Sequence, residues 1–267
     1  MSDARILYLE PVGGIAGDML RRLRNWSLRQ AEMNVAIGEL MRQRLIAEGI
    51  PAERVTVIPN WADGEAITPV PHEENRLRRE WGLEGKFVVG YSGNLGRAHE
   101  HETLLGAADR LQGERHLVFL FIGGGASMDG LRAEAQARGI ENLIFRPYQA
   151  AERLRESLAV ADVHLVVLRP EMEGLIVPSK FYGIAAAGRP TIFVGSGDGE
   201  IAGVLASGEA GLAVDQGDDA ELGAAILRLR DNPALRERMG RNARRLCEER
   251  FSRRAALEHW ERVLSAA

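Results

Sequence analysis

The sequence predicts an α/β fold built on a parallel β-sheet. Six short apolar runs recur from residue 87 onward, and segments with helical spacing of apolar residues lie between them. Alternating strands and helices, with both faces of the sheet covered, indicate parallel strands joined by right-handed crossovers. The last roughly 50 residues show helical spacing only, so we expect the domain to end in helices.

The expected strands are the apolar runs at 87–92, 117–122, 143–145, 163–168, 191–194 and 211–214. The expected helices between them cover 102–111, 128–138 and 151–160, and another runs from Lys180 to Gly188, with Pro190 just beyond it. Three more are expected at 218–231, 232–250 and 252–265. Asp218 and Ser252 have the residue types of helix N-caps.

The first 86 residues follow a different pattern. Residues 5–9 are expected to form a strand, followed by a glycine-rich loop at 13–17, one long helix over 20–48 and a strand at 55–59. The polar, proline-containing segment 60–72 is typical of a connection between domains. We therefore predict a partial N-terminal domain at 1–63 and a larger domain at 64–267.

Composition limits the classes of function. The net charge of −4 argues against non-specific nucleic-acid binding. A single cysteine, Cys247, excludes an intramolecular disulfide framework and fits a reducing cytoplasm. No apolar run approaches the ~18 residues of a membrane span. The histidines show no metal-ligand spacing, so we expect no bound metal. No nucleophile–base set is visible, and the catalytic residue stays unknown.

A glycine-rich turn follows the first of the six strands. It contains Gly93, Asn94 and Gly96 and leads through Arg97 and His99 into a helix. Glycines let a backbone approach a ligand, and a helix N-terminus favours an anion. The alternative is that these glycines only allow the backbone conformation of a strand-to-helix turn. The spacing is not GxGxxG, so a dinucleotide fingerprint is not supported.

Two further segments lie where parallel strands end. Gly123 and Gly124 follow the second strand, where ligands bind in open α/β sheets, although a tight turn explains them equally well. The acidic loop after the fourth strand contains Glu173 and runs through Ser179 to Lys180. Of 34 basic residues only two are lysines, and this one begins a helix, so we predict a phosphate site there. The alternative is a solvated acidic loop.

The N-terminal segment carries its own surface features. Four arginines flank Trp26 in a helical pattern, which suits either contact with anionic lipid or a solvated helix face: Arg21, Arg22, Arg24 and Arg29. Apolar residues such as Trp26, Leu28, Met41 and Leu45 have few predicted strands to cover them. We therefore expect exposed apolar surface, with either self-association or a mobile N-terminal region.

Several runs together resemble the group 1 (family 4) glycosyltransferases, in particular the branch that builds bacterial O-antigen and capsule polysaccharides. They lie at 57–63, 90–96, 121–125, 178–183 and 187–190, with a similar tail at 231–240 and 249–252. The resemblance spans about residues 21–267. It implies a GT-B architecture, in which two Rossmann-like domains face each other and the C-terminal one, 64–267 here, holds a nucleotide-diphospho-sugar donor.

The resemblance also implies site residues. The leaving diphosphate would be neutralised without a metal or cofactor by Arg97 or His99 and by Lys180, beside Gly93, Asn94 and Ser179. The nucleoside and sugar would lie near Gly123, Gly124, Tyr148, Gln149 and Glu173. One departure concerns the paired glutamates of many family members, whose positions hold Leu175 and Gly183 here. The other is that only about 60 residues precede the connection, where a typical domain has on the order of 150.

These observations predict a retaining, metal-independent glycosyltransferase, or its donor-binding half. It would move a sugar to a lipid-linked or saccharide acceptor during surface-polysaccharide synthesis, in the cytoplasm or at the inner face of the membrane. One alternative is a non-catalytic nucleotide-sugar-binding subunit completed by a separate acceptor-domain chain. Another is a nucleotide-sugar epimerase on the same fold.

Overall fold

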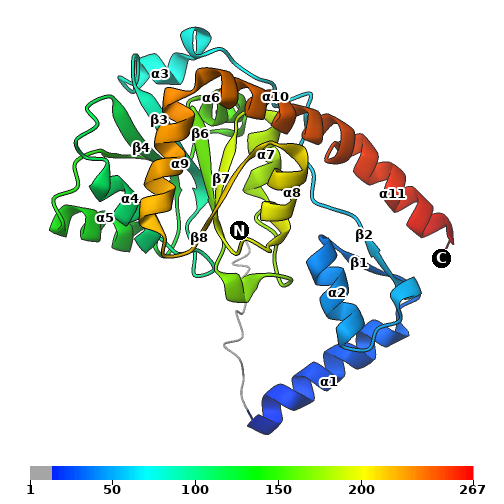
Figure 1. Ribbon diagram of the computed structural model, residues 1–267. Coiled ribbons are helices and arrows are strands. Elements are labelled where there is room, and N and C mark those ends of the chain that lie inside the picture. Colours follow the sequence, from blue (N-terminus) through cyan, green and yellow to red (C-terminus); the bar gives the residue numbers. More distant parts are fainter. Residues whose placement is uncertain (1–13, 267) are drawn as a thin grey trace.

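The computed structural model describes residues 14–266, and its larger unit is built on a six-stranded parallel sheet (Figure 1). The strand order is β5-β4-β3-β6-β7-β8. The strands are β3 (Phe87–Asn94), β4 (Leu117–Gly124), β5 (Leu143–Arg146), β6 (Val163–Val167), β7 (Thr191–Gly195) and β8 (Gly211–Asp215). All six predicted strands and the α/β class are confirmed. The strand at 5–9 lies outside the described residues.

Helices cover both faces of this sheet (Figure 1). One face packs against α4 (Glu102–Arg110), α5 (Met128–Ala137) and α9 (Asp219–Asp231). The other packs against α3 (Arg76–Glu80), α6 (Leu154–Ala159), α7 (Lys180–Ala186), α8 (Glu200–Gly208) and α10 (Pro233–Arg250). Short 3₁₀ turns lie at Ala52–Arg54, His72–Glu74, Ala151–Arg153 and Pro170–Met172.

Strand β3 shows how the sequence buries both faces of this sheet. Val89 and Tyr91 enter the core beneath α4 and α5, whereas Val88 enters the core beside α3. Because successive side chains of a strand point to opposite faces, a strand covered on both sides is apolar at nearly every position. This explains the continuous apolar runs in the sequence.

The C-terminal helices form as predicted. Asp218 accepts a hydrogen bond from the N–H of Glu221 at 2.8 Å, and the Ser252 hydroxyl accepts one from the N–H of Ala255 at 3.2 Å. Both are therefore N-caps. Helix α11 (Arg253–Ala266) follows α10 and extends away from the sheet (Figure 1).

The smaller unit corrects the sequence prediction. It consists of α1 (Gly14–Gln30), β1 (Asn34–Ala36), α2 (Glu39–Ala47) and β2 (Val55–Val57), with β1 and β2 paired in parallel. The single helix predicted over 20–48 is wrong because β1 interrupts it, and residues 14–17 begin α1 rather than forming a loop. The amide of Asn34 donates to the carbonyls of Leu28 and Arg54, at 3.0 and 3.2 Å, and helical periodicity does not reveal such tertiary bonds.

Apolar side chains of α1 are exposed, as expected for Trp26. The exposed members of this helix are Met19, Leu20, Leu23 and Trp26, between 45% and 70% accessible. By contrast, Leu28, Met41 and Leu45 pack against a small core around Ile50 and Val55, so their predicted exposure is wrong. Within residues 14–266, no helix is long and apolar enough to cross a membrane.

Candidate donor-binding site

A pocket of about 570 Å³ opens where the strand order of the sheet reverses. From β3 the chain continues to β4 and β5 on one side, and β6, β7 and β8 lie on the other. The carboxyl ends of strands at such a switch point form the usual ligand crevice of open α/β sheets. The pocket is lined by the ends of β3 and β4, the loop after β5, helix α6, the segment entering α7, and the connection around Trp61.

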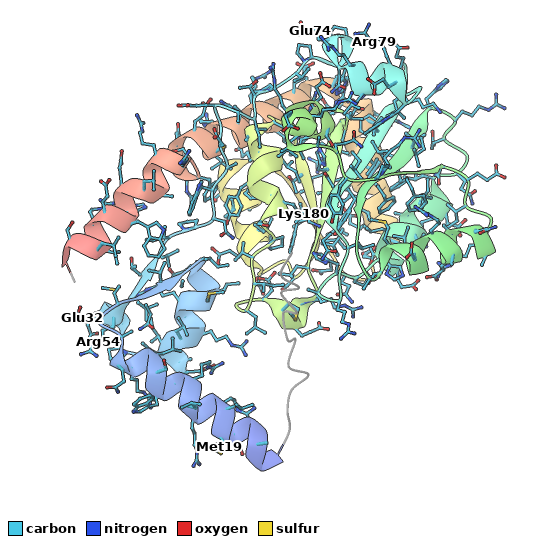
Figure 2. All side chains as sticks on the ribbon, turned by 180° about the vertical axis from the view of Figure 1, so that it is seen from behind. Met19, Glu32, Arg54, Glu74, Arg79 and Lys180 are labelled. Atoms are coloured by element: carbon cyan, nitrogen blue, oxygen red, sulfur yellow. The ribbon has the colours of Figure 1, made fainter. Side chains whose placement is uncertain are left out.

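Lys180 provides the positive charge of this pocket. It is the first residue of α7 (Figure 2), and its Nζ lies 3.7 Å from the centre of the Tyr91 ring and donates to the Tyr91 hydroxyl. Among the described residues, no carboxylate lies within 4 Å of this ammonium. Burial lowers the pKa of Lys180 to about 7. An ammonium without a counter-ion in such a place favours an anionic ligand.

Tyr91 forms the floor beneath Lys180. Its side chain is 1% exposed, and its hydroxyl donates to the carbonyl of Asn94 at 2.9 Å. Because that proton is committed to Asn94, the hydroxyl can only accept from Lys180. Burial raises the pKa of Tyr91, so the phenol stays neutral. Sequence analysis missed this residue, although its place two positions before Gly93 on an apolar strand put it near the turn.

Two facing glycines shape the end of the sheet. Gly93 and Gly123 are register partners with φ of 125° and 134°. A Cβ added to Gly123 would lie 2.3 Å from the carbonyl oxygen of Gly93 and 3.2 Å from the ring of Tyr148. The missing side chain therefore lets Tyr148 lie against the strand end, where its half-exposed ring forms a wall of the pocket.

His99 enters the pocket as a neutral side chain. Nδ1 of His99 lies 3.1 Å from the backbone nitrogen of Gly96 and 3.2 Å from its carbonyl oxygen, so it accepts from the first or donates to the second, depending on which ring nitrogen carries the proton. Burial, together with the charge of Lys180, lowers the pKa of His99 to about 4. His99 therefore offers the pocket a hydrogen-bonding ring nitrogen rather than a positive charge.

A buried carboxylate lies at the start of α4, where the glycine turn suggested an anion site. The carboxylate of Glu100 accepts from the N–H and the hydroxyl of Thr103, at 2.9 and 2.7 Å. Glu100 is buried and caps the helix, so a negative charge already occupies this N-terminus. The charge for a ligand must come from elsewhere, namely Lys180.

The structure brings most of the predicted site residues together. Those that line the pocket are Gly93, Asn94, His99, Tyr148, Gln149, Ser179 and Lys180. Gly123 and Gly124 lie behind Tyr148 rather than in the lining, and Arg97 is exposed outside it. The acidic loop meets the glycine turn, since the N–H of Arg169 donates to the carbonyl of Ala98 at 3.0 Å.

Glu173 is not brought to the pocket. One of its oxygens accepts from the N–H of Glu200 at 3.2 Å, at the start of α8, and the other is buried without a partner among the described residues. Burial raises the pKa of Glu173, although the hydrogen bond opposes this. Glu200 in turn accepts from the N–H of Leu40 at 2.9 Å, linking the smaller unit to this loop.

One group of side chains within residues 14–266 has the composition of a metal site. Ligand atoms of His101, Glu102 and Glu134 lie within 4.8 Å of one another. Arg138 donates to both carboxylates, at 2.7 Å for Glu102 and closer for Glu134. The guanidinium thus supplies the positive charge that a metal would bring, and the residues do not indicate a metal site.

Fold and pocket together define a Rossmann-like domain with a pocket, lined by Lys180, at its switch point. Residues 73–246 match the family described as Glycosyl transferases group 1, and the chain belongs to this family. WcaI of Escherichia coli K12, named for colanic acid biosynthesis, is 32% identical over 178 residues, which are 66% of this chain and 44% of WcaI. The glycosyltransferase WbjE of Pseudomonas aeruginosa is 34% identical over 194 residues, 72% of this chain and 48% of WbjE.

The chain therefore spans about half the length of these two curated relatives. Among solved structures, Anabaena HepE in complex with UDP superimposes with a TM-score of 0.83 and 19% identity, over 97% of this chain and 70% of HepE. The similarity to HepE supports the GT-B glycosyltransferase fold that the sequence predicted.

Proposed function

We propose that this chain is the nucleotide-sugar-binding part of a glycosyltransferase that builds a surface polysaccharide. The sugar would pass from a nucleoside diphosphate to a lipid-linked or saccharide acceptor. Membership of the glycosyltransferase family supports the class of reaction. The name of WcaI supports polysaccharide synthesis, and the bound UDP and UDP-glucose of HepE support the class of donor.

The observation that carries the proposal is the unpaired, desolvated ammonium of Lys180 at the switch point of the sheet. When the bond between the sugar and the β-phosphate breaks, negative charge grows on the departing diphosphate. A fixed positive group in a poorly hydrated site stabilises that charge more than water does. In this proposal Lys180 would do this, and His99 would add a hydrogen bond.

The other end of the donor would occupy the wall formed by Tyr148. Its ring offers a flat apolar face, and Gln149 beside it carries an amide that can donate and accept hydrogen bonds. This combination suits a nucleobase and its ribose. The proposal retains the family expectation of a retaining, metal-independent reaction and assigns no catalytic residue.

Isothermal titration calorimetry with UDP, UDP-glucose and GDP-mannose tests the proposal. We expect one of these nucleotides to bind and Lys180→Ala to weaken it by about 30-fold, as for loss of a buried charge contact of about 2 kcal/mol. Lys86→Ala is the matched control, because Lys86 is the only other lysine of the chain and lies outside the pocket lining. Equal binding by both variants would refute the assignment of Lys180.

A second candidate function is a binding subunit that works with a separate acceptor-domain chain. The exposed apolar side chains of α1 favour it, since Met19, Leu23 and Trp26 are 58% to 70% accessible on one helix. Such a surface is typical of a protein–protein interface. Light scattering of this chain with a candidate partner would show a defined complex, and Trp26→Glu would abolish it.

A further inference from the structure

A second cavity, of about 380 Å³, lies at the opposite edge of the sheet from the donor pocket. It is lined by residues that precede β6 and β7 and by one side of α10. Helix α7 connects the two regions: it begins with Lys180 in the donor pocket, and Gly188 and Arg189 follow its end in this cavity. The volume falls in the range of small-molecule sites.

The cavity is rich in arginine. Five line it, namely Arg189, Arg236, Arg241, Arg244 and Arg245, against three acidic residues, Asp162, Glu237 and Glu248. The lining therefore carries an excess of positive charge in a protein whose net charge is −4. Guanidinium groups bind phosphate through paired hydrogen bonds, so this composition suits a phosphate group.

The acidic residues do not neutralise this excess. Asp162 already accepts from the N–H of Val88 at 2.8 Å and from Arg78 at 3.1 Å, and Arg236 is 3.9 Å away. Glu248 forms an ion pair with Arg244 at 2.6 Å. Arg244 is itself structural, since it donates to three backbone carbonyls, those of Gly64, Ile67 and Ala186.

Arg189 is the least satisfied group in the lining. Its Nη2 donates to the carbonyls of Val70 and Ala159, at 2.8 and 2.9 Å, but its Nε is buried with no partner in the described chain. Burial lowers the pKa of Arg189 to about 10, with Arg78 acting in the same direction and Asp162 opposing it. Keeping a guanidinium charge largely away from water is costly, and an anion in the cavity would offset that cost.

Two further arginines stand at the exposed rim. Within residues 14–266, Arg245 has no carboxylate within 4 Å, and Arg241 reaches only Glu237, at 3.8 Å. Both members of that pair are about two-thirds exposed, so the pair contributes little. Arg241 and Arg245 therefore offer exposed guanidinium groups to a ligand in the cavity.

We infer that this cavity binds the phosphate group of a small phosphorylated molecule, at a site separate from the donor pocket. Guanidinium groups at the rim would hold the phosphate oxygens, and the charge of Arg189 would attract the anion. The inference does not depend on the proposed function, because its residues lie outside the donor pocket.

Thermal unfolding with inorganic phosphate and pyrophosphate, against sodium chloride at equal ionic strength, tests the inference. We expect a saturable rise in Tm in the wild type and in Lys180→Ala, which removes the donor-site charge. The double variant Arg241→Gln/Arg245→Gln changes two exposed side chains, so it should fold, and it should bind at least about tenfold more weakly. Arg238→Gln, an exposed arginine of α10 outside the cavity, should behave as the wild type.

Three outcomes would overturn the inference. The first is that neither anion raises the Tm saturably. The second is that the rise in Tm is the same in the double variant as in the wild type, and the third is that Lys180→Ala abolishes it. Vesicles of phosphatidylglycerol distinguish a lipid headgroup from a free phosphate. Sedimentation of the wild type with them, lost in the double variant, would assign the site to lipid phosphate, and its absence beside a Tm effect would assign it to a soluble one.

Discussion

Lys180 and Tyr91 come from segments 89 residues apart and meet at the floor of the donor pocket, with the ammonium 3.7 Å from the ring centre and bonded to the hydroxyl. A cation over an aromatic face is stabilised by the ring, and the hydroxyl fixes its direction. This contact holds the ammonium in place before any ligand arrives. Because the ammonium is already in position, little free energy is needed to rearrange it when negative charge develops on the ligand.

Tyr91→Phe tests the contribution of the hydroxyl. It keeps the ring but leaves the Asn94 carbonyl without its donor and Lys180 without its acceptor, so we expect a loss of about 1–2 kcal/mol in the free energy of unfolding. Nucleotide affinity should fall several-fold. Tyr182→Phe is the matched control, since Tyr182 is also buried but its hydroxyl makes no hydrogen bond among the described residues. Urea denaturation and calorimetry measure both effects, and equal behaviour of the two variants would contradict the account.

Donor binding should depend on pH through Lys180. Its pKa is about 7 in the free protein, and a bound diphosphate raises it because an anion favours the charged form. The complex therefore keeps a proton that the free protein loses as the pH rises above about 7. Affinity for UDP-glucose should be constant below that pH and fall by about tenfold per pH unit above it.

Calorimetry from about pH 6 to about pH 9 checks this dependence. In buffers with different heats of ionisation, the measured heat should reveal proton uptake at alkaline pH. Lys180→Met should bind weakly with no pH dependence in this range. An affinity that stays the same across the range in the wild type would contradict the role given to Lys180.

Gly123→Ala should damage the end of the sheet. The new Cβ would clash with the carbonyl of Gly93 and push against Tyr148, at a φ that side-chain-bearing residues rarely adopt. We expect a loss of stability of about 2–3 kcal/mol and weaker nucleotide binding. Gly130→Ala is the control, because this glycine lies in α5 with open space around it, and alanine there should stabilise the helix by about 0.5–1 kcal/mol. Thermal unfolding compares the two.

Glu173→Gln separates a structural role from a donor contact. The side chain meets the start of α8 beside Glu200 and lies outside the pocket lining, so removing its charge should leave nucleotide affinity within about twofold. Because burial and the nearby Glu200 raise the pKa of Glu173, the amide should also leave stability unchanged or improved. A tenfold loss of UDP-glucose affinity, measured by calorimetry, would show that Glu173 reaches the donor.

The sheet could be predicted from the sequence because each strand is buried on both faces and therefore continuously apolar. The N-caps could be predicted because Asp218 and Ser252 act within their own turns. The interruption of the predicted helix by β1 could not be predicted, because the three residues of β1 pair with β2, about 20 positions further along the chain. Local periodicity contains no information on such pairing.

In the candidate site, too, some features could be predicted from the sequence and others could not. Lys180 stood out as one of two lysines at a predicted helix start, and the glycines marked the strand ends. The contact of Lys180 with Tyr91 could not be predicted, because it joins strand β3 to the helix between β6 and β7. The neutral state of His99 depends on its burial and on the nearby charge of Lys180, and the capping of α4 by Glu100 depends on local geometry.

The central claim is that Lys180 holds the diphosphate of a nucleotide-sugar donor. Since the chain contains only two lysines, ¹⁵N-lysine labelling gives one Nζ resonance for Lys180 and one for Lys86, which serves as an internal control. The account predicts that Lys180 titrates near pH 7 in the free protein and that saturation with UDP-glucose moves its pKa toward the ordinary value of about 10.4, with Lys86 unchanged. A pKa of Lys180 that is the same with and without bound donor would contradict it.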